Sequence, residues 1–305
     1  MNLNYLPYEE RTPDQQYQQL LKQLLSSGVY SPTQQSIKSG DERKGTYSLP
    51  FPVVHIYPIE NGFPLETARS YRGGCTKAVE EIFAIINGVR NVSGFKERGC
   101  DFWDSTFEDP KKATKRGLAP GDLGLASYAV LHDFPTPTGT FNQMQAVLDQ
   151  IAELPHLKTH TMTTLYPPGI YRGKGRTQQV VTVPCHGSII NLIVLGEKLY
   201  FEVVFRSSDI PIGELPDRAE YAALWMAICH VTGYDPGTFS IVYLNPHYYG
   251  NQRDVVEELA SREPRRFPTM TLKDPPNDLF SFRAANFELS DYDPHPPIKG
   301  IAVTP

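Results

Sequence analysis

Val183-Pro184-Cys185-His186 is followed in the chain by Phe205-Arg206-Ser207-Ser208-Asp209 and then by Asp217. This stretch contains a thiol, a guanidinium, hydroxyls and carboxylates. A thiol becomes a nucleophile when a nearby cation lowers its pKa, and Arg206 is a candidate for that cation. The Arg206 guanidinium and the Ser207 hydroxyl offer several hydrogen-bond donors to a phosphate. The stretch therefore predicts a site at which a thiolate acts on a phosphorylated substrate.

The local sequence around these residues predicts strands and a helix. Residues 178–183, 189–195 and 199–205 are β-rich runs, and Gly196-Glu197-Lys198 fits a hairpin turn between the last two. Adjacent strands would place Cys185 and Arg206 one hairpin apart. Residues 217–232 have a helical pattern that ends at Gly233.

Each residue also has a simpler structural interpretation. Cysteine is among the residue types most often buried in a core, so an isolated thiol is a weak signal. An arginine at a strand end commonly pairs with a surface carboxylate. Asp217 stands where the helix of residues 217–232 begins, and Asp is among the best N-cap residues. The stretch alone leaves these alternatives open.

The rest of the chain predicts a single α+β domain. Further helices are expected over residues 17–25, 77–87 and 141–154, further strands over 51–59 and 239–244, and loops over 31–50 and 110–124. Glu81 lies at the edge of the apolar side of the second of these helices. A carboxyl turned inward there would have a raised pKa, which suits proton transfer.

Composition excludes several classes of protein. The net charge of −5 argues against a non-specific nucleic-acid binder. The four cysteines, Cys75, Cys100, Cys185 and Cys229, lack metal-site spacing, so we expect no metal and a reducing compartment. We see neither a signal peptide nor a membrane span, and we expect a cytoplasmic protein, in the host cytoplasm if the protein is viral.

Taken together, the motifs resemble the thymidylate synthase family over all but about the first forty residues. The resemblance is carried by Gly62-Phe63-Pro64-Leu65-Glu66-Thr67, Glu81 to Gly88, Phe102-Trp103-Asp104, Gly121-Asp122-Leu123-Gly124, Pro184-Cys185-His186, Arg206-Ser207-Ser208-Asp209, Pro246-His247-Tyr248-Tyr249, Arg262-Glu263-Pro264-Arg265 and Tyr292-Asp293-Pro294-His295-Pro296. It implies a mixed β-sheet with flanking helices, dimerising through the sheet. Residues 1–45 would form an N-terminal helix and a mobile phosphate loop, and residues 46–305 the catalytic domain.

The resemblance also implies roles for individual residues. Cys185 would attack C6 of a pyrimidine nucleoside monophosphate, Glu81 would move protons, and Tyr128 would lie at the C5 side. The substrate-binding residues would be Arg43, Arg206 and Ser207 at the phosphate and His247 and Tyr249 at the sugar. The residues in contact with the co-substrate 5,10-methylenetetrahydrofolate would be Trp103, Asp209 and Gly213.

Two departures from the family pattern bear on the substrate and the partner. The family asparagine that contacts the uracil edge falls on Asp217, as in the cytidylate hydroxymethylase branch. A carboxyl suits the N3 and amino group of cytosine better than uracil. The arginine pair that the family lends across its dimer falls on Lys158-Thr159. We therefore expect a cytidylate (CMP or dCMP) 5-hydroxymethylase. The alternatives are a cytidylate methylase, a thymidylate synthase and a non-catalytic nucleotide- or RNA-binding relative.

Overall fold

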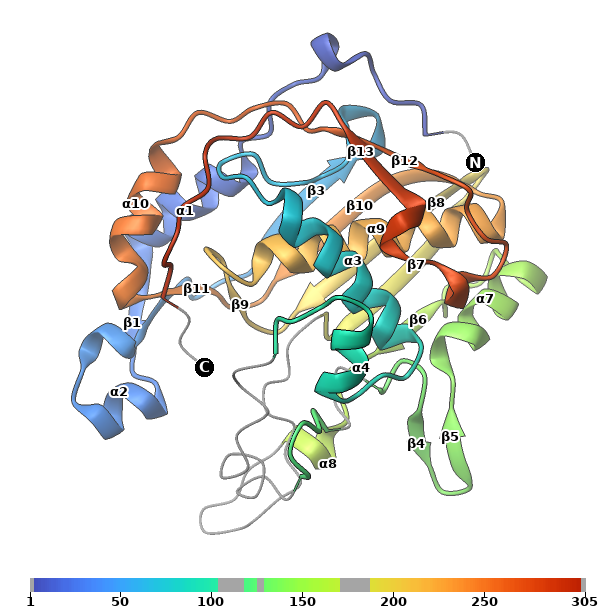
Figure 1. The fold of residues 1–305 in the computed structure, drawn as a ribbon, viewed down its shortest axis with the longest axis horizontal. Coiled ribbons are helices and arrows are strands. Elements are labelled where there is room, and N and C mark those ends of the chain that lie inside the picture. The colour runs from blue at the N-terminus through green and yellow to red at the C-terminus, as the bar shows by residue number, and fades with distance from the viewer. Residues whose placement is uncertain (1–2, 104–117, 125–128, 171–186, 303–305) are drawn as a thin grey trace.

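The central element of the structure is a five-stranded mixed sheet. The computed structural model describes residues 3–103, 118–124, 129–170 and 187–302 (Figure 1). The strand order is β3 (Val53–Pro58), β10 (Asp235–Tyr243), β8 (Lys198–Phe205), β7 (Ile189–Leu195) and β6 (Thr161–Thr163). β10 and β8 are parallel, and the other neighbours are antiparallel.

The hairpin of β7 and β8 positions Arg206. Its turn is tight because Gly196 adopts a positive φ of 61°, which glycine tolerates without strain. Along β8, Leu199, Phe201, Val203 and Phe205 alternate with less buried residues, so one face of the strand enters the core. The predicted hairpin is confirmed, and Arg206 directly follows its second strand.

Helices cover the inner face of this sheet. α9 (Glu214–Thr232) contacts β10 and β8, and α3 (Arg72–Ile86) packs on α9, so the layers run sheet, α9, α3 (Figure 1). α9 is apolar around most of its circumference, as expected of a helix enclosed on all sides. α7 (Gln143–Glu153) packs against the same helix and against β6.

A second sheet lies beside the first and contains the predicted loop of residues 31–50. Its order is β1 (Val29–Ser31), β2 (Thr46–Ser48), β11 (Pro246–Tyr249) and β9 (Ser208–Asp209). The expectation of a loop was incomplete, because residues 31–50 include β2, α2 (Gln34–Ser39) and the 3₁₀ turn η2 (Glu42–Lys44). Thr33 caps α2 by a reciprocal hydrogen bond with Ser36, which explains the helix in so polar a segment.

The remaining elements surround these two sheets. α1 (Gln16–Ser27) packs on α10 (Arg253–Ser261), and two small hairpins are formed by β4 (Phe134–Thr136) with β5 (Gly139–Phe141) and by β12 (Thr269–Leu272) with β13 (Phe287–Ser290). The short helices are α4 (Val92–Glu97), α8 (Pro167–Ile170) and the 3₁₀ turns η1 (Tyr8–Glu10), η3 (Ile59–Asn61), η4 (Gly250–Gln252), η5 (Leu279–Ser281) and η6 (Ala284–Asn286). None of the helices in the described residues is long and apolar enough to cross a membrane. The α+β fold is as predicted.

Candidate active site

The end of β8 meets the start of β11, and this junction brings together Arg206, Ser207 and His247. The Ser207 hydroxyl donates to Asn245 Oδ1 at 3.2 Å and lies 3.4 Å from His247 Nδ1. Burial lowers the pKa of His247, and the Arg206 cation lowers it further. A neutral imidazole beside a hydroxyl and a guanidinium is suited to hydrogen bonding with a polar ligand.

His247 and Tyr249 are alternate residues of β11 and face the same side. Their ring centroids lie 5.5 Å apart with an interplanar angle of 82°. Gly250 N donates to Gly45 O at 2.9 Å, which holds the η2 loop beside this strand. Arg43 is thereby close in the fold to the Tyr249 segment, although its guanidinium pairs with Asp41 at 3.1 Å.

Asp209 and Gly213 form the turn between β9 and α9. Gly213 N donates to Asp209 O at 2.7 Å, and the Asp209 carboxylate accepts from Gln252 Nε2 at 3.1 Å. The other carboxylate oxygen, Oδ1, is buried and has no hydrogen-bond partner among the described residues. Burial raises the pKa of Asp209 to about 7, against the lowering effects of Gln252 and Arg69. This acid is therefore partly protonated near neutral pH.

The structure corrects the predicted start of the helix at Asp217. α9 begins at Glu214, and its N-cap residue is Gly213. Asp217 N donates to Gly213 O at 3.2 Å, so the residue is already inside the first turn. The carboxylate oxygen Oδ2 lies 3.8 Å from the position that a Cβ on Gly213 would take. Helix capping does not account for this half-buried acid.

Glu81 lies on α3, the helix that packs on α9. Its side chain is buried, as predicted, and its Oε1 accepts a hydrogen bond from Trp103 Nε1 at 2.5 Å. An indole donor fixes the direction of the carboxylate. Two of the predicted site residues, Glu81 and Trp103, are therefore in direct contact.

Cys185, which the sequence predicts as the nucleophile, and Tyr128 lie outside the described residues. The segment that begins two residues after Cys185 is held against the site, since Gly187 N donates to Tyr221 OH at 2.8 Å and Arg206 N donates to Ser188 Oγ at 3.3 Å. A Cβ on Gly187 would lie 2.2 Å from Val203 Cγ2, so only glycine permits this close approach. Cys75, Cys100 and Cys229 are buried free thiols.

Lys158 does not lie at this site within one chain. It is exposed and precedes β6, whose first residue Thr161 pairs with Asn191. Because β6 is antiparallel to β7, the residues before Thr161 extend toward the hairpin turn at Gly196, whereas Arg206 follows the other end of β8, beyond the pair of Ile189 with Val204. Among the described site residues, Arg206, Ser207, His247 and Tyr249 lie at the β8–β11 junction, and Glu81 on α3 contacts Trp103.

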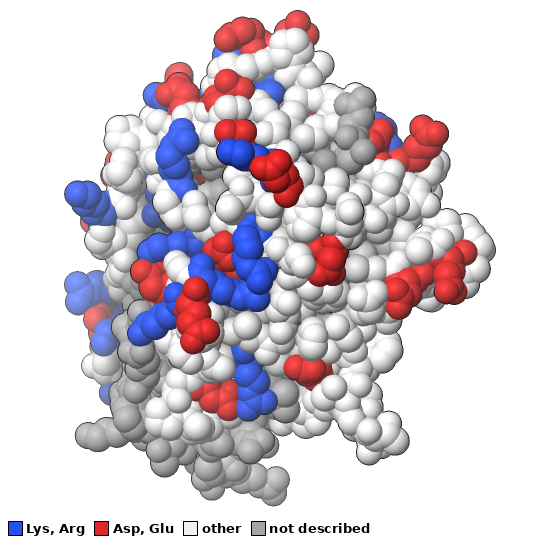
Figure 2. All heavy atoms as spheres, turned by 45° about the vertical axis from the view of Figure 1, so that its right-hand side comes forward, with Lys and Arg blue, Asp and Glu red and all other residues white. Residues whose placement is uncertain are grey.

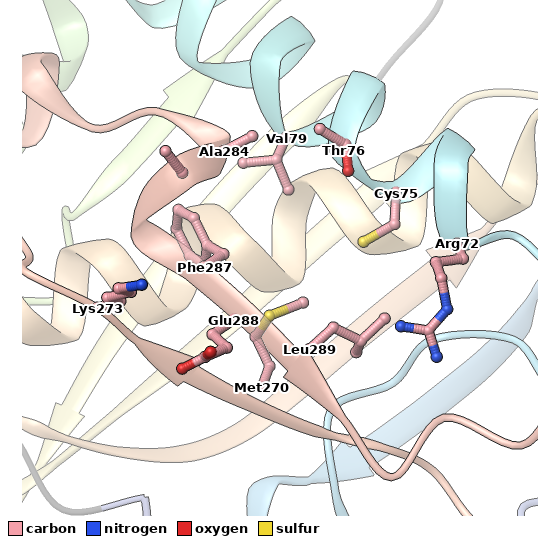
Figure 3. A pocket seen from close by; sticks show the side chains of 11 residues that line it. Arg72, Cys75, Thr76, Val79, Met270, Lys273, Ala284, Phe287, Glu288 and Leu289 are labelled. Atoms are coloured by element: carbon pink, nitrogen blue, oxygen red, sulfur yellow. The ribbon is translucent and has the colours of Figure 1, made fainter.

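A pocket of about 350 Å³ lies elsewhere, between α3 and the β12–β13 hairpin (Figure 3). Arg72, Thr76 and Val79 line it from α3. Glu81 lies five residues beyond Thr76 and two beyond Val79, which at 100° per residue puts it on the opposite side of the helix. This pocket contains none of the predicted site residues.

Surface charge is mixed on the face seen in Figure 2. Lys and Arg gather near its centre, and Asp and Glu lie among them. Across the described ranges, no group of three or more His, Cys, Asp or Glu is arranged to hold a metal ion.

Comparison with known families agrees with this geometry. The family model described as thymidylate synthase matches residues 15–304. The chain therefore belongs to the thymidylate synthase family, which comprises folate-dependent enzymes that transfer a one-carbon unit to a pyrimidine nucleotide. The match extends to the N-terminal side of the expected boundary, since it includes α1 and the η2 loop.

Two contributors to the site were missed by sequence reasoning. Asn245 joins Ser207 to the start of β11, and Gln252 joins Asp209 to two other segments. Neither stands in a pattern with chemical meaning of its own, because their partners are distant in sequence. The only available signal was their closeness to the His247–Tyr249 motif.

Proposed function

We propose that the protein is a folate-dependent cytidylate 5-hydroxymethylase, which acts on dCMP or CMP. The observation that carries this proposal is Asp217 in the first turn of α9. Its N–H is satisfied by Gly213 O, and the N-cap position is already taken by Gly213. We infer that this half-buried acid, which stands where the family has the base-reading asparagine, recognises the base. We expect it to be turned toward the N3 and amino group of the pyrimidine.

Hydrogen-bond chemistry explains why an acid at this position favours cytosine. Cytosine presents an amino donor at C4 and an unprotonated N3, whereas uracil presents a carbonyl and an N3–H. A protonated carboxyl donates to N3 and accepts from the amino group, and an ionised carboxylate suits an N3-protonated cytosine. The ionised carboxylate cannot donate to the C4 carbonyl of uracil, and a dry pocket penalises that mismatched edge.

In the proposed reaction each of the predicted site residues has a separate role. Cys185 adds as a thiolate to C6, which makes C5 nucleophilic, and Arg206 stabilises both the thiolate and the 5′-phosphate. Ser207 shares the phosphate, with Arg43 from the η2 loop, while His247 and Tyr249 hold the sugar. Glu81, oriented by Trp103 Nε1, moves protons at the base.

The residues proposed for folate fit that co-substrate by their unsatisfied chemistry. Asp209 Oδ1 is buried without a hydrogen-bond partner in the described part of the chain, and a raised pKa near neutrality lets the group donate or accept. Gly213 lies beside it, with its N–H donating to Asp209 O at 2.7 Å. 5,10-methylenetetrahydrofolate would supply the one-carbon unit. Trp103 and Tyr128 would contact the reacting face.

The fate of the one-carbon unit separates two cytidylate products. In the proposed reaction the unit replaces the hydrogen on C5, water supplies the hydroxyl, and folate leaves as tetrahydrofolate without any change of oxidation state. A methylase would instead take a hydride from folate and release dihydrofolate.

We also propose a homodimer formed through the outer face of the five-stranded sheet. Val54 and Ile56 on β3 are 52% and 53% exposed, and Ile189 on β7 is 41% exposed. Apolar side chains on an open sheet face favour burial against a partner. Such a dimer offers Lys158, at the β6 edge, a route to the partner's phosphate site. A monomeric mass by light scattering would contradict the dimer.

Asp217→Asn is expected to shift preference from cytosine toward uracil nucleotides. An asparagine amide donates to the C4 carbonyl and accepts from N3–H, so it matches uracil. Mismatched polar groups cost roughly 1–3 kcal/mol each, so the ratio of kcat/KM values for dCMP and dUMP should change about ten- to a hundredfold. Competition between the two nucleotides, in parent and variant, measures this ratio. An unchanged ratio would remove the reason for assigning a cytidylate substrate.

Arg206→Ala is expected to raise the nucleotide KM and lower kcat, because one cation serves both the phosphate and the thiolate. A charged hydrogen bond contributes about 1.5–3 kcal/mol, so kcat/KM should fall about ten- to a hundredfold. Lys198→Ala is the matched control, since Lys198 is an exposed cation at the other end of the same strand. The unphosphorylated nucleoside should lose less activity than the nucleotide in Arg206→Ala, because only the support of the thiolate is then lost. A variant that binds the nucleotide as the parent does would exclude the phosphate assignment.

The product of parallel reactions with CMP, dCMP and dUMP tests the whole proposal. A product heavier than cytidylate by CH₂O supports hydroxymethylation, and one heavier by CH₂ supports the methylase. Conversion of dUMP alone would identify a thymidylate synthase. Binding of nucleotide with no product from any of the three would identify a non-catalytic relative.

A further inference from the structure

Gln252 is a buried residue that joins three separate segments of the chain. Its side chain is fully buried at the end of η4. Oε1 accepts from Tyr249 N at 2.7 Å, while Nε2 donates to Asp209 Oδ2 at 3.1 Å and to Ala302 O at 2.9 Å. Both amide hydrogens are therefore used, and their acceptors lie on β9 and near the C-terminus.

The contact with Ala302 holds the C-terminal segment to the site. Figure 1 shows this segment running down past α1 and ending close to β11. Earlier residues of the segment are held separately, since Arg262 donates to Pro296 O at 2.8 Å. Among the described residues 299–302, Ala302 O accepts a hydrogen bond from Gln252 Nε2, and the structure gives no other hydrogen bond to these four residues. Docking of this end of the chain thus depends on one amide.

The contact with Asp209 selects which carboxylate oxygen meets a ligand. Gln252 satisfies Oδ2, and the buried oxygen without a partner in the described residues is Oδ1. A hydrogen bond from Gln252 favours the ionised carboxylate and lowers the pKa that burial raises. Loss of this donor would free the carboxylate to rotate and would raise its pKa further.

We propose that Gln252 is a positioning residue that couples docking of the C-terminal segment to the orientation of Asp209. The inference rests on the proposed function, in which Asp209 contacts folate and Tyr249 contacts the nucleotide sugar. Because the same Nε2 atom bonds to both Asp209 and Ala302, a docked terminus keeps the amide in the rotamer that presents Asp209 Oδ1. By reciprocity, folate bound to Asp209 tightens the terminus.

Gln252→Glu separates this coupling from the contact with Tyr249. A glutamate keeps the oxygen that accepts from Tyr249 N but cannot donate to Asp209 or Ala302 unless it is protonated. We expect the folate KM to rise about tenfold, the nucleotide KM to change less than about threefold, and the acidic limb of the pH–rate profile to move to higher pH. Gln252→Leu, which loses all three bonds, should raise both KM values.

A double-mutant cycle with a chain ended after Lys299 tests the coupling itself. If Ala302 acts through Gln252, ending the chain should cost the parent about tenfold in kcat/KM and should cost Gln252→Glu almost nothing further. Gln143→Glu is the matched control, because Gln143 is a buried glutamine whose Nε2 also bridges two carbonyls, Val130 O and Thr163 O, both at 2.8 Å. If the losses in kcat/KM from Gln252→Glu and from the truncation multiply in the double variant, the two changes act independently and the proposal is wrong.

A readout without turnover distinguishes failure of this inference from failure of the proposed function. Carboxypeptidase should release the terminal residues faster from Gln252→Glu than from the parent or Gln143→Glu, whatever the reaction is. Methylenetetrahydrofolate should slow this release in the parent and in Gln143→Glu but not in Gln252→Glu. Equal release from all three proteins would overturn the tether. Faster release from Gln252→Glu with no effect of folate on the parent would support the tether and contradict the folate assignment.

Discussion

Cys185→Ser is expected to abolish turnover and to leave nucleotide binding largely intact. Addition at C6 requires a soft, ionised nucleophile, and a serine alkoxide is far less available than a thiolate at neutral pH. Loss of a covalent nucleophile normally costs much more than a hundredfold in kcat. Steady-state turnover and equilibrium binding of dCMP, measured on the same preparations, give the two quantities.

The other cysteines provide the control for this experiment. Burial raises the pKa of Cys75 to about 12, and burial raises the pKa values of Cys100 and Cys229 as well, so these thiols are poor nucleophiles. Cys75→Ser should retain the parent's kcat. Activity of Cys185→Ser above about a hundredth of the parent would exclude Cys185 as the nucleophile.

The sequence predicted those helices and strands that are determined by neighbouring residues in the chain. The β7–β8 hairpin follows from alternation on both sides of Gly196, and α3 and α7 follow from helical spacing. The start of α9 was placed three residues too late, because Pro216-Asp217 suggested a cap. The true first turn contains Glu214, which is held by Arg218 four residues later. A buried ion pair, not a capping side chain, decides this boundary.

The site was predictable to the extent that its residues stand in family motifs. Ser207 lies 3.4 Å from His247, the His247 and Tyr249 rings are in contact, and Glu81 is buried. Gln252 was not predictable, because its three partners are spread from β9 to the C-terminus and only the folded chain brings them together. The expected role of Lys158 at a partner's phosphate site stays a prediction, because it involves a second chain.

A buried charge network supports the α9 end of the site and was also absent from the predictions. Arg218 is fully buried and pairs with Glu66 at 2.6 Å and with Glu214 at 3.1 Å. Its guanidinium also donates to Tyr57 OH at 3.1 Å, and Tyr243 OH donates to Glu214 at 2.8 Å. Burial raises the pKa of Glu214 to about 7, although Arg218 opposes the shift. The network therefore fixes the turn of α9 that contains Asp217.

Arg218→Met is expected to destabilise the protein by about 3–5 kcal/mol near pH 8, because removal of one partner leaves buried carboxylates without a cation. Without Arg218 the folded-state pKa of Glu214 should rise further above its unfolded value. Groups with raised folded-state pKa values lose stability as pH rises through those values, so the penalty should be smaller at pH 5 than at pH 8. Urea unfolding at the two pH values measures both effects.

Two further variants decide whether charge is the cause. Arg253→Met removes an arginine from an exposed pair, Arg253 with Glu257 at 2.9 Å, that has the same four-residue spacing, and it should change stability little. Combining Glu66→Gln and Glu214→Gln with Arg218→Met removes the uncompensated charges and should recover much of the loss and abolish its pH dependence. A pH-independent loss in Arg218→Met, unrelieved by the two glutamines, would show that packing of the long side chain against Tyr17 and Tyr57, rather than its charge, holds the first turn of α9 in place.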